Sequence, residues 1–173
     1  AYSTERVAHT AIMMILNLSS SMQIQQAMLA RGDRSNFTKC MQVSHVEVNG
    51  KVLGVVGAGT IGREVIKVAQ ALGMKVLAYT RTPRADEDNL KYVSLEELLK
   101  QSDYISLHCP LTPQTRHMIN KETIAMMKPT AYIINTGRGA LIDEPALIEA
   151  LQEGRIAGAG LDVQETEPPV QDN

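Results

Sequence analysis

The sequence predicts a doubly wound α/β protein with a parallel sheet, preceded by one long helix. From Lys51 onward, short and almost wholly apolar runs such as KVLGVVG alternate with amphipathic stretches such as IGREVIKVAQALG. Such apolar runs are typical of strands covered on both faces, and strands that alternate with helices pair in parallel through right-handed crossovers. A glycine-rich turn, GAGTIG, joins the first of these strands to the first of these helices.

Composition narrows the class of protein. A chain of 173 residues suits one domain with a full core, and only one Phe, five Tyr and no Trp occur in it, so the core must be aliphatic. The net charge is −2 and there is no basic tract, which argues against a nucleic-acid or membrane-surface protein. The apolar run AIMMIL is too short to span a bilayer. Cys40 and Cys109 show no metal-ligand spacing, so we expect a reducing, cytoplasmic setting.

The elements follow in order. Apolar residues from Thr4 to Arg31 recur with the helical period and predict one long helix, whose methionines we expect to fill core or subunit contacts. The polar stretch RGDRSNFTKCMQVSH predicts a linker. After the first strand and helix, MKVLAY, KYV, DYISL, AYIIN and IAGAGLD predict strands, and SLEELLKQ, NKETIAMM and DEPALIEALQEG predict helices. Ser94 and Glu97 have the spacing of a capping box at a helix start.

The GAGTIG turn predicts a dinucleotide site. Gly57 permits a tight turn, Gly59 lets the backbone approach a pyrophosphate, and Gly62 allows the helix to pack closely on the strand. A helix N-terminus also attracts negative charge. The predicted cofactor-binding residues of this turn are Gly57, Gly59, Thr60, Ile61 and Gly62.

The end of the second predicted strand bears on the choice of dinucleotide. NAD sites usually carry an acidic residue here, but this chain has Thr80, and no acid occurs before Asp86. Arg81 and Arg84 follow Thr80 and could bind a 2′-phosphate, which favours NADP slightly over NAD. The alternative is that Arg81 stacks over the adenine while Arg84 is solvated.

Two charged residues follow later strands. Arg138 lies in the turn NTGRG, and Asp162 ends the last strand. In open α/β sheets, ligands bind outside the carboxyl ends of the strands, and a guanidinium binds a carboxylate with two parallel hydrogen bonds. We therefore expect hydride transfer to a carbonyl next to a carboxylate. The alternative is a structural ion pair between Arg138 and Asp162 at the sheet edge.

The chain resembles the D-isomer-specific 2-hydroxyacid dehydrogenases over nearly its whole length. The resemblance rests on YSTERVAHTAIMMIL, NGKVLGVVGAGTIGREV, SDYISLHCPLTPQTRHMIN, INTGRGALIDEPALIEAL and GRIAGAGLDVQETEP, in this order. It implies an NAD(P)-dependent enzyme that interconverts small 2-oxoacids and D-2-hydroxyacids. The alternative of a different class is a corepressor-like regulatory module of the same fold.

The resemblance also implies roles for particular residues. Arg138 would hold the substrate carboxylate and keto oxygen, Glu167 would pair with the catalytic histidine, and Asp162 would contact the nicotinamide carboxamide. Further cofactor contacts would be Pro110, Thr115 and Thr136.

The resemblance implies a division of the chain as well. Residues 1–45 would form an interdomain helix, a linker and a dimerisation arm, and residues 46–173 the dinucleotide-binding domain of a homodimer. Most of the substrate domain would lie outside this chain, together with the catalytic histidine.

The chain departs from the family pattern at the start of the long helix, and its own histidines are the candidates to replace the absent catalytic one. VAHT is one residue shorter than the V-A-x-H-T of the family, so the start of the long helix could be shifted. His108 ends a strand at the ligand-facing edge, where we expect it to line the cofactor site rather than to act as the acid. His9, His45 and His117 have no carboxylate partner nearby in the sequence, and we expect them to be solvated or to cap helices.

Overall fold

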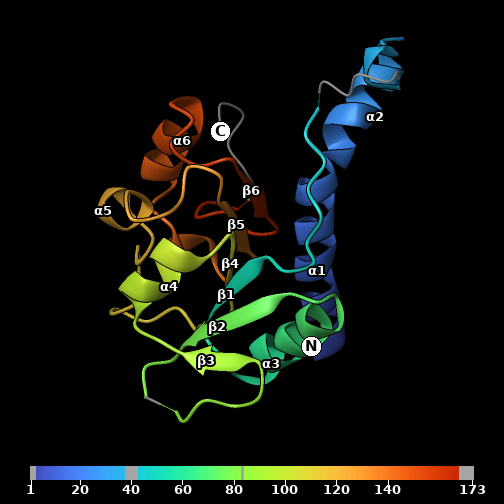
Figure 1. Ribbon diagram of the computed structural model, residues 1–173. Coiled ribbons are helices and arrows are strands. Elements are labelled where there is room, and N and C mark those ends of the chain that lie inside the picture. The colour runs from blue at the N-terminus through green and yellow to red at the C-terminus, as the bar shows by residue number, and fades with distance from the viewer. Residues whose placement is uncertain (1–2, 38–42, 83, 168–173) are drawn as a thin grey trace.

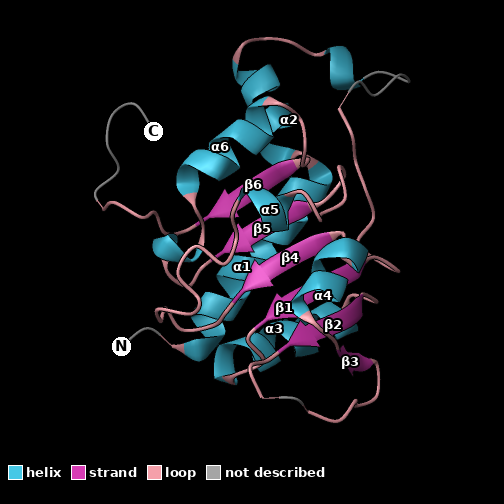
Figure 2. Ribbon diagram, turned by 90° about the vertical axis from the view of Figure 1, so that its left-hand side faces the viewer, coloured by secondary structure: helices cyan, strands magenta, loops and turns pink. Residues whose placement is uncertain are grey.

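Six parallel strands form one sheet with helices on both faces (Figures 1 and 2). The structure is a computed structural model that describes residues 3–37, 43–82 and 84–167. The strands are β1 (Val52–Val56), β2 (Lys75–Tyr79), β3 (Leu90–Tyr92), β4 (Tyr104–Leu107), β5 (Tyr132–Asn135) and β6 (Gly158–Leu161). The helices are α1 (Thr4–Ser20), α2 (Met22–Ala30), α3 (Thr60–Ala71), α4 (Leu95–Gln101), α5 (Lys121–Ile124) and α6 (Glu144–Gln152), with short 3-10 turns η1 (Ser35–Phe37) and η2 (Gly139–Leu141).

The strand order is β3-β2-β1-β4-β5-β6, with every neighbouring pair parallel. The chain therefore winds outward from β1 in one direction and returns to continue from β4 in the other. A ligand crevice is expected at this reversal, outside the carboxyl ends of the strands. The predicted fold class is confirmed.

Alternate strand residues supply two separate hydrophobic layers. Val55 and Ile134 point to the face covered by α1 and α3, whereas Val56 and Ile133 point to the face covered by α4, α5 and α6. All four side chains have no exposed surface. Burial on both faces explains why the strands read as continuous apolar runs rather than as alternating ones.

The predicted single helix over residues 4–31 is wrong, because it is interrupted at Ser21. Ser21 has a left-handed backbone with φ 51°, and its hydroxyl donates to the Ser44 carbonyl. The Ser19 and Ser20 hydroxyls both donate to the Leu16 carbonyl, so they compete for the acceptors of the last helical turn. The chain consequently forms α1, which packs on α3, and α2, which projects away from the sheet (Figure 1).

The predicted cap of α4 is half confirmed. The Ser94 hydroxyl accepts from the Glu97 amide at 3.1 Å, while the Glu97 carboxylate accepts from Gln101 instead of closing a capping box. A full capping box occurs at α5, between Asn120 and Thr123, which the sequence analysis did not identify. In the described ranges, no helix combines the length and the apolarity that a membrane span requires.

Candidate functional site

A cleft of about 1060 Å³ opens across the carboxyl ends of β1, β4, β5 and β6. It gathers residues from the N-terminal helix, from the start of α3 and from the turns after three strands. The residues that line it are Arg6, Val7, Thr10, Ile61, His108, Cys109, Pro110, Leu111, Thr136, Gly137, Arg138, Asp162, Val163 and Glu167. Seven of the predicted site residues therefore meet in one place: Ile61, His108, Pro110, Thr136, Arg138, Asp162 and Glu167.

The glycine turn after β1 has the geometry that its sequence predicts. Gly57 has φ +99°, and a Cβ atom there would lie 2.6 Å from the Cys109 nitrogen. A Cβ on Gly62 would lie 2.1 Å from the Gly57 carbonyl oxygen, so α3 packs against the turn with no room for a side chain. A Cβ on Gly59 would meet nothing within 4 Å. The space at Gly59 is open, as close approach of a ligand to the backbone requires.

The N-terminus of α3 is also free of a side-chain cap. Gly59 is its N-cap and makes no side-chain hydrogen bond, whereas α1, α4, α5 and α6 are capped by Ser3, Ser94, Asn120 and Asp143. The first amides of an α-helix have no acceptor within the helix. At α3 they are available to an anion.

The NTGRG turn after β5 is held by Asn135. The Asn135 carboxamide accepts from the Gly137 amide at 3.0 Å and donates to the Arg138 carbonyl at 3.0 Å. The Arg138 guanidinium donates to the Gly137 carbonyl at 2.8 Å and makes no ion pair with any described residue. The alternative of a structural Arg138–Asp162 pair is therefore not observed among these residues.

Thr136 carries an unsatisfied polar atom in the cleft. The residue is 8% exposed, and its hydroxyl has no hydrogen-bond partner among the described residues. A buried hydroxyl without a partner costs free energy, on the order of 1–3 kcal/mol. A ligand group that bonds to Thr136 would recover this cost.

The two acidic residues of the cleft lie in the segment after β6. The Asp162 amide donates to the Asn135 carbonyl at 3.0 Å, which ties this segment to the end of β5. The Glu167 carboxylate accepts from the Gln164 amide at 3.2 Å. Both acids are exposed and line the cleft.

His108 is uncharged at neutral pH. Its Nε2 atom lies 2.8 Å from the Ser106 hydroxyl, and desolvation lowers the pKa of the imidazole to about 4. A group with this pKa carries almost no transferable proton at pH 7, so His108 is poorly suited to act as a general acid. Its neighbour Cys109 is half-buried, and burial raises the pKa of its thiol.

The expectation that His117 is solvated or caps a helix is wrong. His117 does have a carboxylate partner, because its Nε2 atom lies 3.0 and 3.1 Å from the two Glu165 oxygens. Arg116 pairs with the same carboxylate, and the hydrogen bond with His117 is the largest effect that lowers the pKa of Glu165. The partners are 48 residues apart, so sequence spacing gave no signal. This cluster ties the segment after β6 to the loop after β4.

The remaining predicted residues lie outside the lining of the cleft. Thr115 accepts from the Thr112 amide and donates to the Pro110 carbonyl, so it braces the loop that carries Pro110. Thr80 donates to the Thr82 carbonyl, and Arg81 and Arg84 are exposed. Their cofactor contacts stay predictions. The sequence analysis did not identify Arg6, Val7 and Thr10, which reach the cleft from the N-terminal helix.

The comparisons with known proteins give a consistent result. The family model for the D-isomer specific 2-hydroxyacid dehydrogenase, NAD binding domain, matches residues 12–173. The hydroxypyruvate reductase of Blautia hydrogenotrophica is 44% identical over 176 aligned positions, which cover 99% of this chain and 55% of that protein. The glyoxylate reductase of Thermococcus litoralis is 55% identical over 124 positions, 70% of this chain and 38% of that protein.

Solved structures agree with the sequence matches. The D-lactate dehydrogenase of Aquifex aeolicus, in complex with NAD and lactic acid, has a TM-score of 0.88 and 43% sequence identity. The match covers 96% of this chain and 50% of that one. The acyclic imino acid reductase Bsp5, in complex with NADPH and D-Arg, has a TM-score of 0.87 and 32% identity, with 99% and 54% covered. The chain thus spans about half the length of the proteins it resembles over its full extent.

The glycine turn allows stability and ligand binding to be separated. We expect Gly62→Ala to destabilise the fold by about 1–3 kcal/mol, because the added methyl group meets the Gly57 carbonyl oxygen. Gly59→Ala should unfold within about 0.5 kcal/mol of the parent, since its methyl group meets only open space, yet it should weaken NADH binding. Urea unfolding and NADH calorimetry measure the two effects, and a Gly59→Ala chain that binds NADH normally would contradict the expectation.

His108 predicts a pH dependence of stability. Its pKa of about 4 in the folded protein lies below the ordinary value of 6.5. Its contribution to the free energy of unfolding is therefore complete above pH 6.5 and is lost as the pH falls toward 4. Between pH 7 and 5 the loss should be about 2 kcal/mol. Urea unfolding of the parent and of His108→Gln at both pH values tests this, and the variant should lack this part of the decline. Identical declines in both chains would show that His108 titrates normally.

Proposed function

The chain belongs to the D-isomer specific 2-hydroxyacid dehydrogenase family, as its NAD-binding domain, and from this premise we propose that it is the cofactor-binding half of an enzyme that interconverts a small 2-oxoacid and a D-2-hydroxyacid. The observation that carries the proposal is the meeting of Arg138, Glu167 and the unsatisfied Thr136 hydroxyl in one cleft.

The cleft and the glycine turn fit a dinucleotide. The uncapped amides of α3 and the open space at Gly59 suit a pyrophosphate, and Gly57 and Gly62 shape the turn that presents them. Thr136 supplies a hydroxyl for a ribose, and Asp162 supplies a carboxylate for a carboxamide at the far end of the cleft. When bound, the nicotinamide supplies or accepts the hydride.

The side chains of the cleft suit a 2-oxoacid. Arg138 is unpaired with any described acid and offers a planar fork to the substrate carboxylate and keto oxygen. In this proposal Glu167, which lines the same cleft, orients the proton donor of the reaction. The presence of both residues in one cleft favours an enzyme over a regulatory module of the same fold.

We predict that this chain binds NADH but does not oxidise it. The neutral His108 is the only histidine that lines the cleft among described residues, and general acid catalysis alone contributes about a hundred- to ten-thousandfold. Calorimetry measures NADH binding, and absorbance with glyoxylate, hydroxypyruvate or pyruvate measures turnover. Absence of NADH binding would refute the cofactor site, and turnover abolished by His108→Ala would make His108 the acid.

We further propose that NADPH binds at least as tightly as NADH. Thr80 stands where an acid would repel the 2′-phosphate, and the nearby Glu87 is already paired with Arg63 at 2.8 Å. Arg81 and Arg84 are exposed and available to the phosphate.

The double variant Arg81→Gln, Arg84→Gln tests this choice. Charged hydrogen bonds contribute about 1.5–3 kcal/mol each, so NADPH should bind at least about tenfold more weakly, while NADH changes less than about threefold. Calorimetry with both cofactors gives the ratio, and Arg31→Gln, Arg34→Gln is the control with the same change of charge. A clear preference of the parent chain for NADH would refute the proposal.

We also propose that residues 1–45 form a dimerisation arm in a cytoplasmic homodimer. α2 projects from the sheet and exposes Met22, Ile24 and Leu29 at 58%, 54% and 50%. Large exposed apolar side chains on a projecting helix are typical of an interaction surface. The free thiol of Cys109 is consistent with a reducing compartment, and Cys40 lies outside the described residues.

Sedimentation tests the arm. The parent chain should be a dimer at micromolar concentration, and Met22→Gln, Ile24→Gln, Leu29→Gln should be a monomer, because the apolar contact is removed. Ile148→Gln is the control, since Ile148 is 39% exposed on α6 and lies outside the arm. A monomeric parent chain, or a triple variant that remains dimeric, would contradict the proposal.

A further inference from the structure

Arg6 brings a second cation to the cleft, from α1 rather than from a turn that follows a strand. It lies in the first turn of α1 and lines the cleft together with Arg138. Its backbone is fixed on both sides, because its amide donates to the Ser3 hydroxyl at 3.1 Å and its carbonyl accepts from the Thr10 hydroxyl at 3.0 Å.

The packing of α1 on β6 shows which end of the cleft Arg6 occupies. A Cβ on Gly158 would contact Leu18 at 3.7 Å, and a Cβ on Gly160 would contact Met14 at 3.1 Å. Two strand residues thus match one helical turn, and the helix runs opposite to the strand. Continuing this match places Thr10 beside Asp162 and Arg6 one turn past the strand end, outside the sheet. Arg6 therefore lies at the end of the cleft that holds Asp162, away from β2.

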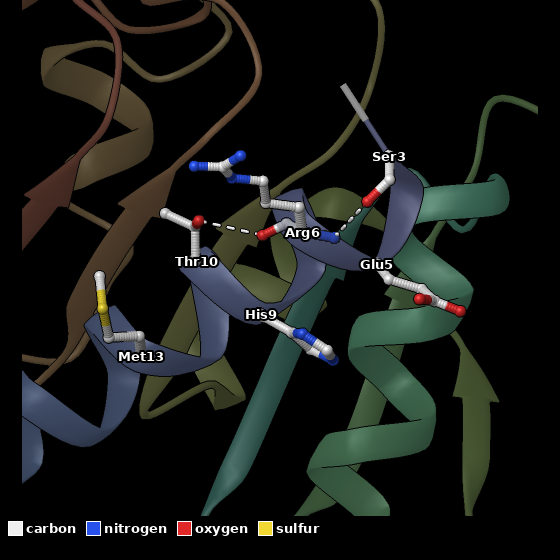
Figure 3. A pocket seen from close by; sticks show the side chains of 6 residues that line it. All are labelled: Ser3, Glu5, Arg6, His9, Thr10 and Met13. Atoms are coloured by element: carbon white, nitrogen blue, oxygen red, sulfur yellow. Dashed lines mark hydrogen bonds between the residues drawn. The ribbon is translucent and has the colours of Figure 1, made fainter. Parts of the chain in front are cut away.

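Arg6 has no evident role in holding the helix. A cation in the first turn opposes the helix dipole, and the favourable groups there are already supplied by Ser3 and Glu5. Arg6 makes no ion pair with a described residue. Figure 3 shows its side chain extending away from Glu5, on the side of the helix that carries Thr10. The guanidinium is exposed and available to an anion.

We propose that Arg6 binds a second anionic group of the substrate, so that the protein prefers 2-oxoacids with a distal carboxylate or phosphate. This rests on the proposed function, in which Arg138 holds the carboxylate next to the carbonyl. One carboxylate occupies one guanidinium fork, so a substrate with a single anionic group leaves Arg6 unused. In the proposed function the pyrophosphate of the cofactor binds at the start of α3, whereas Arg6 lies past the carboxyl end of β6 and its side chain extends away from Glu5 (Figure 3).

Two unreactive ligands that differ only in the distal group test the proposal. Oxamate carries one carboxylate beside its carbonyl, and N-oxalylglycine adds a second carboxylate on a short arm. With the chain saturated with NADH, N-oxalylglycine should bind about tenfold more tightly than oxamate. It should shift the Nε–H NMR signals of both Arg6 and Arg138, whereas oxamate should shift that of Arg138 alone. The phosphonate analogue of N-oxalylglycine shows whether a phosphate is preferred to a carboxylate.

Arg6→Gln should remove the preference and leave oxamate binding within about twofold, while the control Arg31→Gln should keep it. Equal binding of oxamate and N-oxalylglycine by the parent chain, or a preference that survives in Arg6→Gln, would overturn the proposal. Weaker NADH binding by Arg6→Gln with an unchanged ligand preference would assign Arg6 to the cofactor and overturn it as well. Failure of the parent chain to bind NADH would instead refute the proposed function.

Discussion

The cleft depends on how closely three backbone segments approach one another at the turn after β1. The Gly57 amide donates to the Tyr79 carbonyl, and the His108 amide donates to the Val56 carbonyl, so β2 and β4 hold the turn from both sides. At Gly57 and Gly62 no side chain larger than hydrogen fits between these segments and α3. This contact sets where α3 begins and therefore where its free amides point.

Features that are local in the chain could be predicted from the sequence. The strands, the glycine turn and the positions of Arg138 and Asp162 depend on apolar period and on the rule that ligands lie beyond parallel strand ends. Features that depend on long-range contacts could not. Glu165 meets His117 only because the segment after β6 folds back, and Arg6 reaches the cleft through the packing of α1 on α3, β5 and β6. The break at Ser21 was not predicted, because side-chain hydrogen bonds outweighed a continuous helical pattern.

The segment after β6 is held at the cleft by close packing against Gly139, in the turn after β5. A Cβ on Gly139 would lie 2.0 Å from the Gln164 carbonyl carbon, so the two backbones are in direct contact. Glu165 is bound nearby by Arg116, His117 and, through its amide, by the Glu144 carboxylate. The spacing between Arg138 and Glu167 is consequently fixed by backbone packing and by this cluster, and not by a direct bond between the two side chains.

The left-handed residue between α1 and α2 also separates a helix that belongs to the core from one that does not. α1 carries fully buried side chains such as Ala8, Ala11 and Ile15, whereas α2 buries only Met28. Substitutions in α1 therefore disturb the core and the cleft together. Substitutions on the exposed side of α2 change a surface that belongs neither to the core nor to the cleft. A substitution in α2 can therefore alter the outer surface of the protein while the core and the cleft keep their packing.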